Sequence, residues 1–294
     1  MKEITDFIQA IVELLWPAFA FTVFLTYRKE VRVLLQRIRR GKLLGQEIEL
    51  EGSLQQLERS ASQAIIEVTS INSPQSTREL EDDTEENDVS RKILQDAASS
   101  PKAALLILAS ELERELRRLL ASTGWDRGQR LVGLRPGIDI LAESNLIPAN
   151  LGGAVRLFSE MRNRLVHGHS ASDDDILRAI DSGLTILKAV RAVPHESNVV
   201  AHIDVPLYSD EHGRTLLVGV TGVILETTSP GGARKEHRIC PTTQKHFVPG
   251  MRVAWESNQT NIYGPTWFRN PATNALEKAF HSSMEFIGRD LDDV

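Results

Sequence analysis

Cysteine is nearly absent from this chain of 294 residues, and Cys240 is the only one. A single cysteine excludes an intrachain disulfide framework and a multi-cysteine zinc module, and it favours a reducing compartment. The chain also lacks an excess of positive charge, because 34 lysines and arginines stand against 40 aspartates and glutamates, for a net charge of −6. This balance argues against a protein that coats nucleic acid by bulk charge.

Several common catalytic motifs are missing as well. The sequence contains no phosphate-binding glycine loop, nucleophile elbow or paired metal motif, so it predicts no cofactor and no bound metal. Its composition, with 41% hydrophobic and 25% charged residues, is typical of a folded protein. The length predicts two globular units joined by connectors.

The longest uncharged run lies near the beginning of the chain, at residues 14–27 (LLWPAFAFTVFLTY). A helix over residues 8–27 would reach about 30 Å, the thickness of a bilayer core. Residues 28–42 hold seven basic residues and one acid, and such a flank stays on the cytoplasmic side. We therefore predict a single-pass transmembrane anchor over residues 1–27 in the inner or plasma membrane, with the N-terminus outside. An interfacial or buried helix and a cleaved signal peptide are the alternatives, because Glu13 and Pro17 weaken the span.

Residues 28–98 read as a basic juxtamembrane helix followed by an acidic linker. Residues 53–68 carry apolar side chains at heptad spacing, namely Leu54, Leu57, Ala61, Ala64 and Val68. Two heptads are few for a coiled coil, so an ordinary helix resting on a neighbour is the alternative to a weak pairing helix. Residues 79–88 hold seven acids and no base, which predicts a solvated spacer.

Residues 99–192 predict a bundle of four helices. Ser100 and Pro101 suit a helix start, and apolar residues then recur along one face as far as Leu120. A short helix is expected over residues 138–144, a third from Pro148 to about Gly168, and a fourth from Ser172 to Arg191. Short connections between amphipathic helices are typical of a bundle.

Arg162 interrupts the apolar face of the third helix. At about 100° per residue from Leu151, it falls at about 20°, inside the arc of apolar side chains. A guanidinium there loses hydration and needs a carboxylate, a partner subunit or a phosphate. An ion pair to the first helix, with Glu113 as a candidate partner, is therefore one interpretation of Arg162. His167 lies where the helix should end, and a cap residue is its alternative role.

The segment 161–168 (MRNRLVHG) resembles the R-N-x-x-x-H signature of HEPN domains, and the resemblance covers residues 99–192. In that superfamily an arginine, a following polar residue and a histidine lie on a late helix of a small bundle. Carried over, Arg162, Asn163 and His167 occupy these three positions. The resemblance implies a homodimer in which two motifs face each other, and a metal-independent endoribonuclease acting as a defence or toxin effector.

The implied chemistry needs no metal, because RNA carries its own 2′-OH nucleophile. His167 can move the proton, Arg162 can bind the phosphate oxygens, and Asn163 can orient the imidazole. One difficulty is geometric. On an ideal helix Arg162 and His167 point about 140° apart. They converge if the helix unwinds at residues 166–168, or if one of them comes from a second subunit.

Residues 195–294 read as a small β-rich domain closed by a helix. Alternating apolar residues predict strands over residues 199–207 and 214–228, with further strands near 235–240 and 252–256. The apolar spacing of Leu276, Phe280, Met284 and Ile287 predicts a final helix that starts at Asn270.

This domain holds two candidate sites. The set His237, Cys240 and His246 is a zinc candidate without an evident fourth ligand, so polar residues of a hairpin are the alternative. Basic and aromatic residues form a candidate surface for single-stranded nucleic acid, against which an aromatic core or a protein-recognition surface is the alternative. They are Arg234, Lys235, Arg238, Lys245, Phe247, Trp255 and Trp267.

The sequence as a whole predicts an α+β protein: a transmembrane helix, a four-helix HEPN-like bundle and a β-rich domain closed by a helix. The predicted function is a membrane-anchored endoribonuclease whose C-terminal domain senses a trigger or partner. The alternative is a non-catalytic protein that uses the same bundle for dimerisation or for binding a nucleotide or partner at the membrane.

Overall fold

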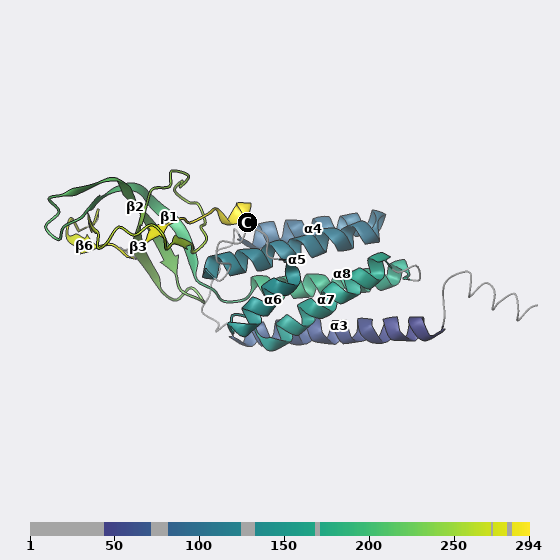
Figure 1. Cartoon of the computed structure of the whole chain (residues 1–294). Coiled ribbons are helices and arrows are strands. Elements are labelled where there is room, and N and C mark those ends of the chain that lie inside the picture. The colour runs from purple at the N-terminus through teal and green to yellow at the C-terminus, as the bar shows by residue number, and fades with distance from the viewer. Residues whose placement is uncertain (1–43, 72–81, 125–132, 168–170, 272, 281–283) are drawn as a thin grey trace, which may run out of the picture.

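A helical bundle and a β-rich domain make up the protein in a computed structural model, which describes residues 44–71, 82–124, 133–167, 171–271, 273–280 and 284–294 (Figure 1). The predicted membrane helix over residues 1–27 and the basic segment after it lie outside the described residues. Among the helices that are described, none combines the length and the apolar character needed to cross a bilayer.

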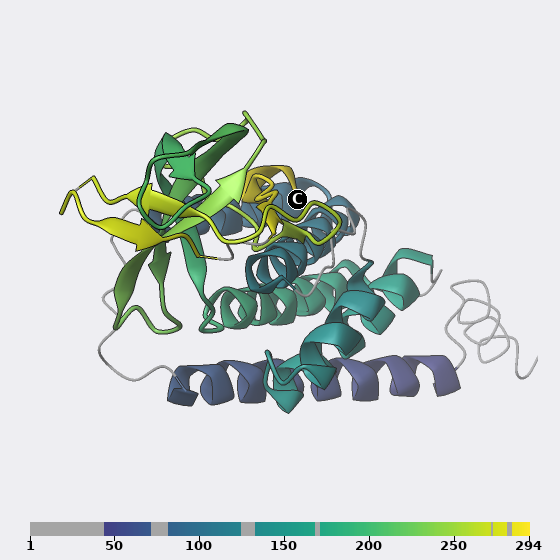
Figure 2. The same cartoon turned by 60° about the vertical axis from the view of Figure 1, so that its left-hand side comes forward.

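The described part of the bundle contains six helices, so the prediction of four is wrong. They are α3 (Leu44–Ile71), α4 (Asp82–Ser99), α5 (Pro101–Thr123), α6 (Leu134–Glu143), α7 (Ala149–His167) and α8 (Asp173–Arg191). Figures 1 and 2 show α4 beside α5, and α3 on the far side of α7 and α8. One hydrophobic core draws side chains from all six helices.

Helix α3 packs against α7 and α8 through its heptad-spaced stripe. Leu54, Leu57, Ala64 and Val68 are fully buried within the bundle. The segment is therefore an ordinary helix that packs on its neighbours, and not a pairing helix of a coiled coil. Ion pairs flank the apolar stripe. Arg178 of α8 bonds Glu51 at 2.7 Å and Glu58 at 2.8 Å.

Helix α4 takes up residues 82–88 of the acidic run that the sequence predicted to be a solvated spacer. Its first half carries the acids, where the positive end of the helix dipole favours them. Its second half buries Ile93 and Ala97, and the helix packs against α5. Three apolar residues on one face, Val89, Ile93 and Ala97, were too weak a signal beside the run of acidic residues.

The predicted helices within residues 99–192 are confirmed as α5 to α8. Ser172 caps α8 in a capping box, because its hydroxyl accepts from the backbone of Asp175 and the Asp175 carboxylate accepts from the backbone of Ser172. Ser100 precedes α5 with Pro101 at the first turn, as expected, but its side chain makes no capping bond.

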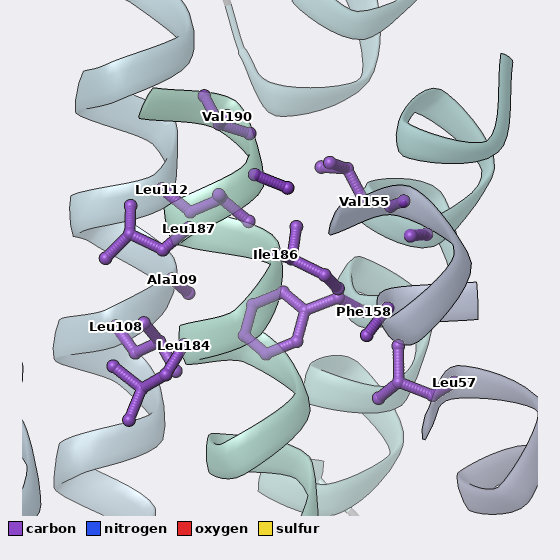
Figure 3. Close-up of a cluster of buried hydrophobic side chains, with 14 of the residues drawn as sticks. Leu57, Leu108, Ala109, Leu112, Val155, Phe158, Leu184, Ile186, Leu187 and Val190 are labelled. Carbon is purple, nitrogen blue, oxygen red and sulfur yellow. The ribbon is translucent and has the colours of Figure 1, made fainter. Parts of the chain in front are cut away.

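Phe158 of α7 lies at the centre of the bundle core. Figure 3 shows its ring among side chains of α3, α5 and α8, including Leu57, Leu108 and Ile186. The close packing requires a glycine on α8. A Cβ at Gly183 would lie 2.5 Å from Phe158 Cε2 and 2.7 Å from Leu108 Cδ2.

The β-rich domain contains an antiparallel sheet of five strands in the order β3-β2-β1-β5-β6. The strands are β1 (Ser197–Tyr208), β2 (Leu216–Thr228), β3 (Lys235–Thr242), β5 (Trp267–Arg269) and β6 (Leu276–Lys278). Three register shifts interrupt the β1–β2 pairing and curl the sheet. Two short strands, β4 (Ser257–Asn258) and β7 (Glu285–Phe286), pair separately.

The predicted final helix is wrong, because this segment forms hairpin strands. The β5–β6 turn contains Asn274 at φ 58, and the Ala275 carbonyl accepts from Asn270 N at 2.8 Å. Phe280 N then donates to Ile239 O of β3 at 2.8 Å. Hydrogen-bond partners that are distant in sequence therefore determine the secondary structure of this segment. The strand expected over residues 252–256 is reduced to isolated bridges at Arg252 and Val253.

Glu285 is a buried carboxylate, only 3% exposed, that joins the separate parts of the β-rich domain. It accepts from Thr243 Oγ1, from Gln244 Nε2 at 3.2 Å, and from Asn258 and Asn261 Nδ2 at 3.2 and 3.0 Å. Burial raises the pKa of Glu285, but these hydrogen bonds outweigh burial and leave the pKa below its ordinary value of 4.5. The ionised form is thus the one that stabilises the domain.

Replacing Glu285 with glutamine is expected to lower the free energy of unfolding at pH 7 by about 1.5–3 kcal/mol, because an amide cannot accept from all four donors. Since the folded-state pKa is depressed, the stabilisation is complete above pH 4.5 and is lost as the pH falls through the folded-state value. Denaturant titrations from pH 7 to pH 3 should show the difference in free energy of unfolding between the wild type and Glu285→Gln becoming smaller. Glu211→Gln, at an exposed position, is the control, and a gap that is constant with pH would contradict this assignment.

The two domains meet at the C-terminal end of α5. Trp255 N donates to Ala121 O at 2.9 Å, so the β-rich domain satisfies a carbonyl of the last helical turn. Arg118 Nε donates to Leu291 O at 3.1 Å, and its Nη2 lies 2.8 Å from the Asp292 carboxylate. Leu291 itself is buried in a small apolar cluster with Ala121.

Candidate functional site

Arg162 lies at the seam between α7 and α5. Its side chain is 25% exposed, and its Nη2 is 3.7 Å from Glu113 Oε1, whose side chain is 30% exposed. Arg162 Nε is buried and has no hydrogen-bond partner among the described residues. The carboxylate that the sequence suggested is therefore beside the guanidinium, but at a distance longer than a hydrogen bond.

Asn163 and His167 lie one turn apart on the exposed side of α7. His167 is the last residue of the helix. The neighbouring Arg164 turns the other way, because its Nη1 pairs with Glu49 of α3 at 3.3 Å. Arg162, Asn163 and Arg164 thus face three different surroundings.

The helical path of α7 separates the arginine from the histidine. The α-helix continues through Val166 and His167, so it does not unwind at those two positions. Gly168 lies outside the described residues. Five residues of intact helix place the two Cα atoms about 7.5 Å apart along the axis and their side chains about 140° apart. Within one chain, Arg162 and His167 therefore do not converge on one point.

The zinc candidate in the β-rich domain brings together no ligand set. Cys240 is fully buried in the sheet core, and burial raises the pKa of its thiol to about 12. Over all the residues that the structure describes, there is no group of three His, Cys, Asp or Glu side chains that could hold a metal ion.

The basic residues of the proposed nucleic-acid surface are each paired with a carboxylate. Arg234 pairs with Glu236, Lys235 with Glu226 and Lys245 with Asp204, at 2.9–3.2 Å. Arg238 pairs with Glu196 at 2.9 Å and lies over the rings of Phe280 and Trp255, at 4.9 and 5.7 Å from their centroids. The aromatic and basic residues near Trp255 thus form part of the domain interior, where Arg238 is only 20% exposed.

Sequence reasoning missed the residues at the domain junction. Arg191 pairs with Glu111 at 2.8 Å and with Glu115 at 3.2 Å, and all three side chains are at most 15% exposed. A cavity of about 290 Å³ also opens at the junction, between α5 and Trp255. The sequence signalled only that Trp255 was one of several aromatic residues, since these elements are far apart along the chain.

Comparisons with known proteins add no family assignment. No protein-family model matches the chain, and no curated protein or solved structure matches it.

Proposed function

We propose that the bundle is an HEPN-type endoribonuclease that acts as a homodimer without a metal. The observation that carries the proposal is the state of Arg162. This arginine lies at the α5–α7 seam with 25% of its side chain exposed, and its Nη2 has only a 3.7 Å contact to Glu113, so a phosphate can take the place of that carboxylate. His167 is exposed at the end of the same helix.

Cleavage would use the substrate's own nucleophile. His167 removes the 2′-OH proton, the 2′ oxygen bonds to phosphorus, and the bond from phosphorus to the 5′ oxygen breaks. The imidazolium returns the proton to the leaving oxygen through water, which gives a 2′,3′-cyclic phosphate and a 5′-OH. Arg162 binds the phosphate oxygens while their charge increases, and Asn163 orients the imidazole.

Two copies of the chain are needed for this site, because Arg162 and His167 point apart on one continuous helix. The seam offers a contact for a second copy. Leu106 and Ile107 of α5 are 43% and 44% exposed, and Leu106 lies two turns before Glu113 on the same helix. A second bundle packed there would bring the His167 of one copy toward the Arg162 of the other.

The test is an RNA cleavage assay in EDTA with three single variants. Arg162→Ala and His167→Ala are expected to reduce the rate by about 10²–10⁴-fold, the usual contribution of such a group. Arg156→Ala is the matched control, because it removes an exposed arginine of the same helix that is paired with Asp139. Equal cleavage by all four proteins, or cleavage by none, would remove the enzyme hypothesis.

Mixing the two inactive variants tests the two-chain site. Random association of Arg162→Ala and His167→Ala chains makes half of the dimers mixed, and each mixed dimer has one site with both groups. We expect about one quarter of the wild-type rate from the mixture. Recovery near zero, with mixed dimers demonstrated by light scattering and native mass spectrometry, would contradict a site that is shared across the chains.

A non-catalytic dimerisation or partner-binding module is the second candidate, and the Arg162–Glu113 ion pair favours it. Glu113→Gln separates the two functions. If Arg162 serves a phosphate, losing the competing carboxylate should strengthen RNA binding and leave folding intact. If the ion pair is structural, the variant should lower the melting temperature and leave RNA binding unchanged.

A further inference from the structure

The cavity at the domain junction is built from both domains. Leu119 from the last turns of α5 and Leu146 from the α6–α7 connection form an aliphatic side, and Trp255 of the β-rich domain forms an aromatic one. Its volume of about 290 Å³ is close to the lower end of the range for small-molecule sites. A molecule of one or two fused rings is therefore the size that fits.

The hydroxyl groups lining the cavity are arranged to accept hydrogen bonds. Ser122 Oγ donates to Leu119 O at 2.9 Å, and Thr123 Oγ1 donates to Leu120 O at 2.9 Å. Each hydroxyl has one proton, which is used in these bonds, so each oxygen has only lone pairs to offer a ligand. A ligand in this cavity must therefore bring the donors.

A carboxylate also lines the cavity. Glu196 accepts from Arg238 Nη1 through Oε1 at 2.9 Å, and its other oxygen remains an acceptor. Among the described residues that line the cavity there is no lysine or arginine. Arg238 balances the charge of Glu196 from outside the lining, so what the cavity offers a ligand is the second carboxylate oxygen, an acceptor that suits an ammonium group better than a phosphate or carboxylate.

The end of α5 adds to this preference. Ser122 and Thr123 belong to the last turn of a helix of 23 residues, and that end carries the negative pole of the helix dipole. Acceptor hydroxyls, a carboxylate oxygen and a helix C-terminus therefore all favour a ligand with an ammonium group, while the part of Trp255 that lines the cavity gives its ring an aromatic contact.

We propose that this junction cavity binds a small planar aromatic amine in its protonated form. The ring lies against Trp255 and Leu119, and the ammonium group faces Glu196 and the two hydroxyls. Because the ligand contacts both domains, its binding stabilises their docking, and it acts as an effector of the β-rich domain. This site does not depend on the proposed nuclease activity, since binding alone reports on it.

Tryptamine and indole-3-propionate are matched probes, because they share a ring system and differ in the sign of the charged group. Calorimetric titration of the full chain is expected to show tryptamine binding at least tenfold tighter than indole-3-propionate. Thr123→Val and Glu196→Gln should each weaken tryptamine binding, the latter by about tenfold. Glu226→Gln, which removes an exposed carboxylate of the same domain paired with Lys235, is the control and should have no effect.

Three results would overturn the proposal: no tryptamine binding at millimolar concentration, equal affinity for the two probes, or binding that is unchanged in both lining variants. Trp255→Leu is a harsher variant, because Trp255 also packs against Phe286. Circular dichroism must therefore show it folded, and loss of tryptamine binding in the folded variant supports the site. Unchanged binding in that variant counts against it.

Discussion

Replacing Phe158 with alanine is expected to lower the free energy of unfolding by about 3–5 kcal/mol, the usual cost of removing a buried aromatic ring. The ring is fully buried at the centre of the bundle, where α3, α5 and α8 all contribute side chains around it (Figure 3). Denaturant unfolding followed by circular dichroism measures the change. Leu177→Ala, at a residue of α8 that is 43% exposed, is the control and should cost less than about 1 kcal/mol.

The same site gives a sharper test through Gly183. Gly183→Ala alone is expected to destabilise by about 1–3 kcal/mol, because its Cβ would lie 2.5 Å from the Phe158 ring and force repacking. In the Phe158→Ala background the ring is gone and Leu108 can move into the space, so the cost of Gly183→Ala should be clearly smaller than in the wild type. Simple additivity of the two changes would show that Gly183 is not held by this contact.

Replacing Arg191 with methionine is expected to cost about 1.5–3 kcal/mol, because it removes the most buried of the cations paired with Glu111 and Glu115 and leaves each carboxylate only its partner on α5, Arg114 or Arg118. Arg191 is 10% exposed, and Glu111 and Glu115 beside it are 11% and 15% exposed. The loss should appear as a lower free energy of unfolding in denaturant titrations. Arg156→Met, which breaks an exposed ion pair with Asp139, should cost less than about 1 kcal/mol.

Neutralising the two glutamates shows whether the loss of stability in Arg191→Met comes from buried charge or from lost packing. In Arg191→Met, the added changes Glu111→Gln and Glu115→Gln remove the two buried carboxylate charges and are expected to recover part of the lost stability, since Arg114 and Arg118 lose their own pairs with these residues. If the triple variant is as unstable as Arg191→Met alone, the cost comes from packing or from other contacts of Arg191, and the assignment to buried charge is wrong.

Helices with strong local signals were predicted closely. The fourth predicted helix matches α8 to within one residue, since Ser172 caps it, three aspartates follow, and Ile176, Ile180 and Leu187 are buried. The third matches α7, which begins directly after Pro148. These signals act within a few residues of one another, so they can be recognised without knowing the rest of the fold.

The errors in the fold concern segments whose partners are distant in sequence. Residues 276–287 carry helical spacing, but β5 and the Ile239 carbonyl of β3 satisfy their backbone as strands. Helix α4 carries many acids, and the surface of α5 makes it stable by burying Ile93 and Ala97. A periodic pattern within one segment does not show whether another part of the fold will pack against it and stabilise it.

The candidate site was predictable in part. Helical geometry predicted that Arg162 would be drawn toward the bundle and that Glu113 was within reach, and the structure places the two at 3.7 Å. The same geometry predicted that Arg162 and His167 diverge, and α7 stays helical through His167. The junction residues Arg191, Glu196 and Trp255 could not be assembled in advance, because no periodic pattern connects them.

By itself, the sequence determined the bundle helices α5 to α8, the long strands β1 to β3, and the burial pattern around Arg162. Each of these depends on hydrogen bonds and side-chain spacing within one short segment. Only the tertiary structure decided that residues 82–99 form a helix, that residues 276–278 and 285–286 form strands, and where the buried ion pairs of Arg191 and the cavity beside Trp255 lie. Those features depend on which surfaces meet, and that is set by the burial of apolar area over the whole chain.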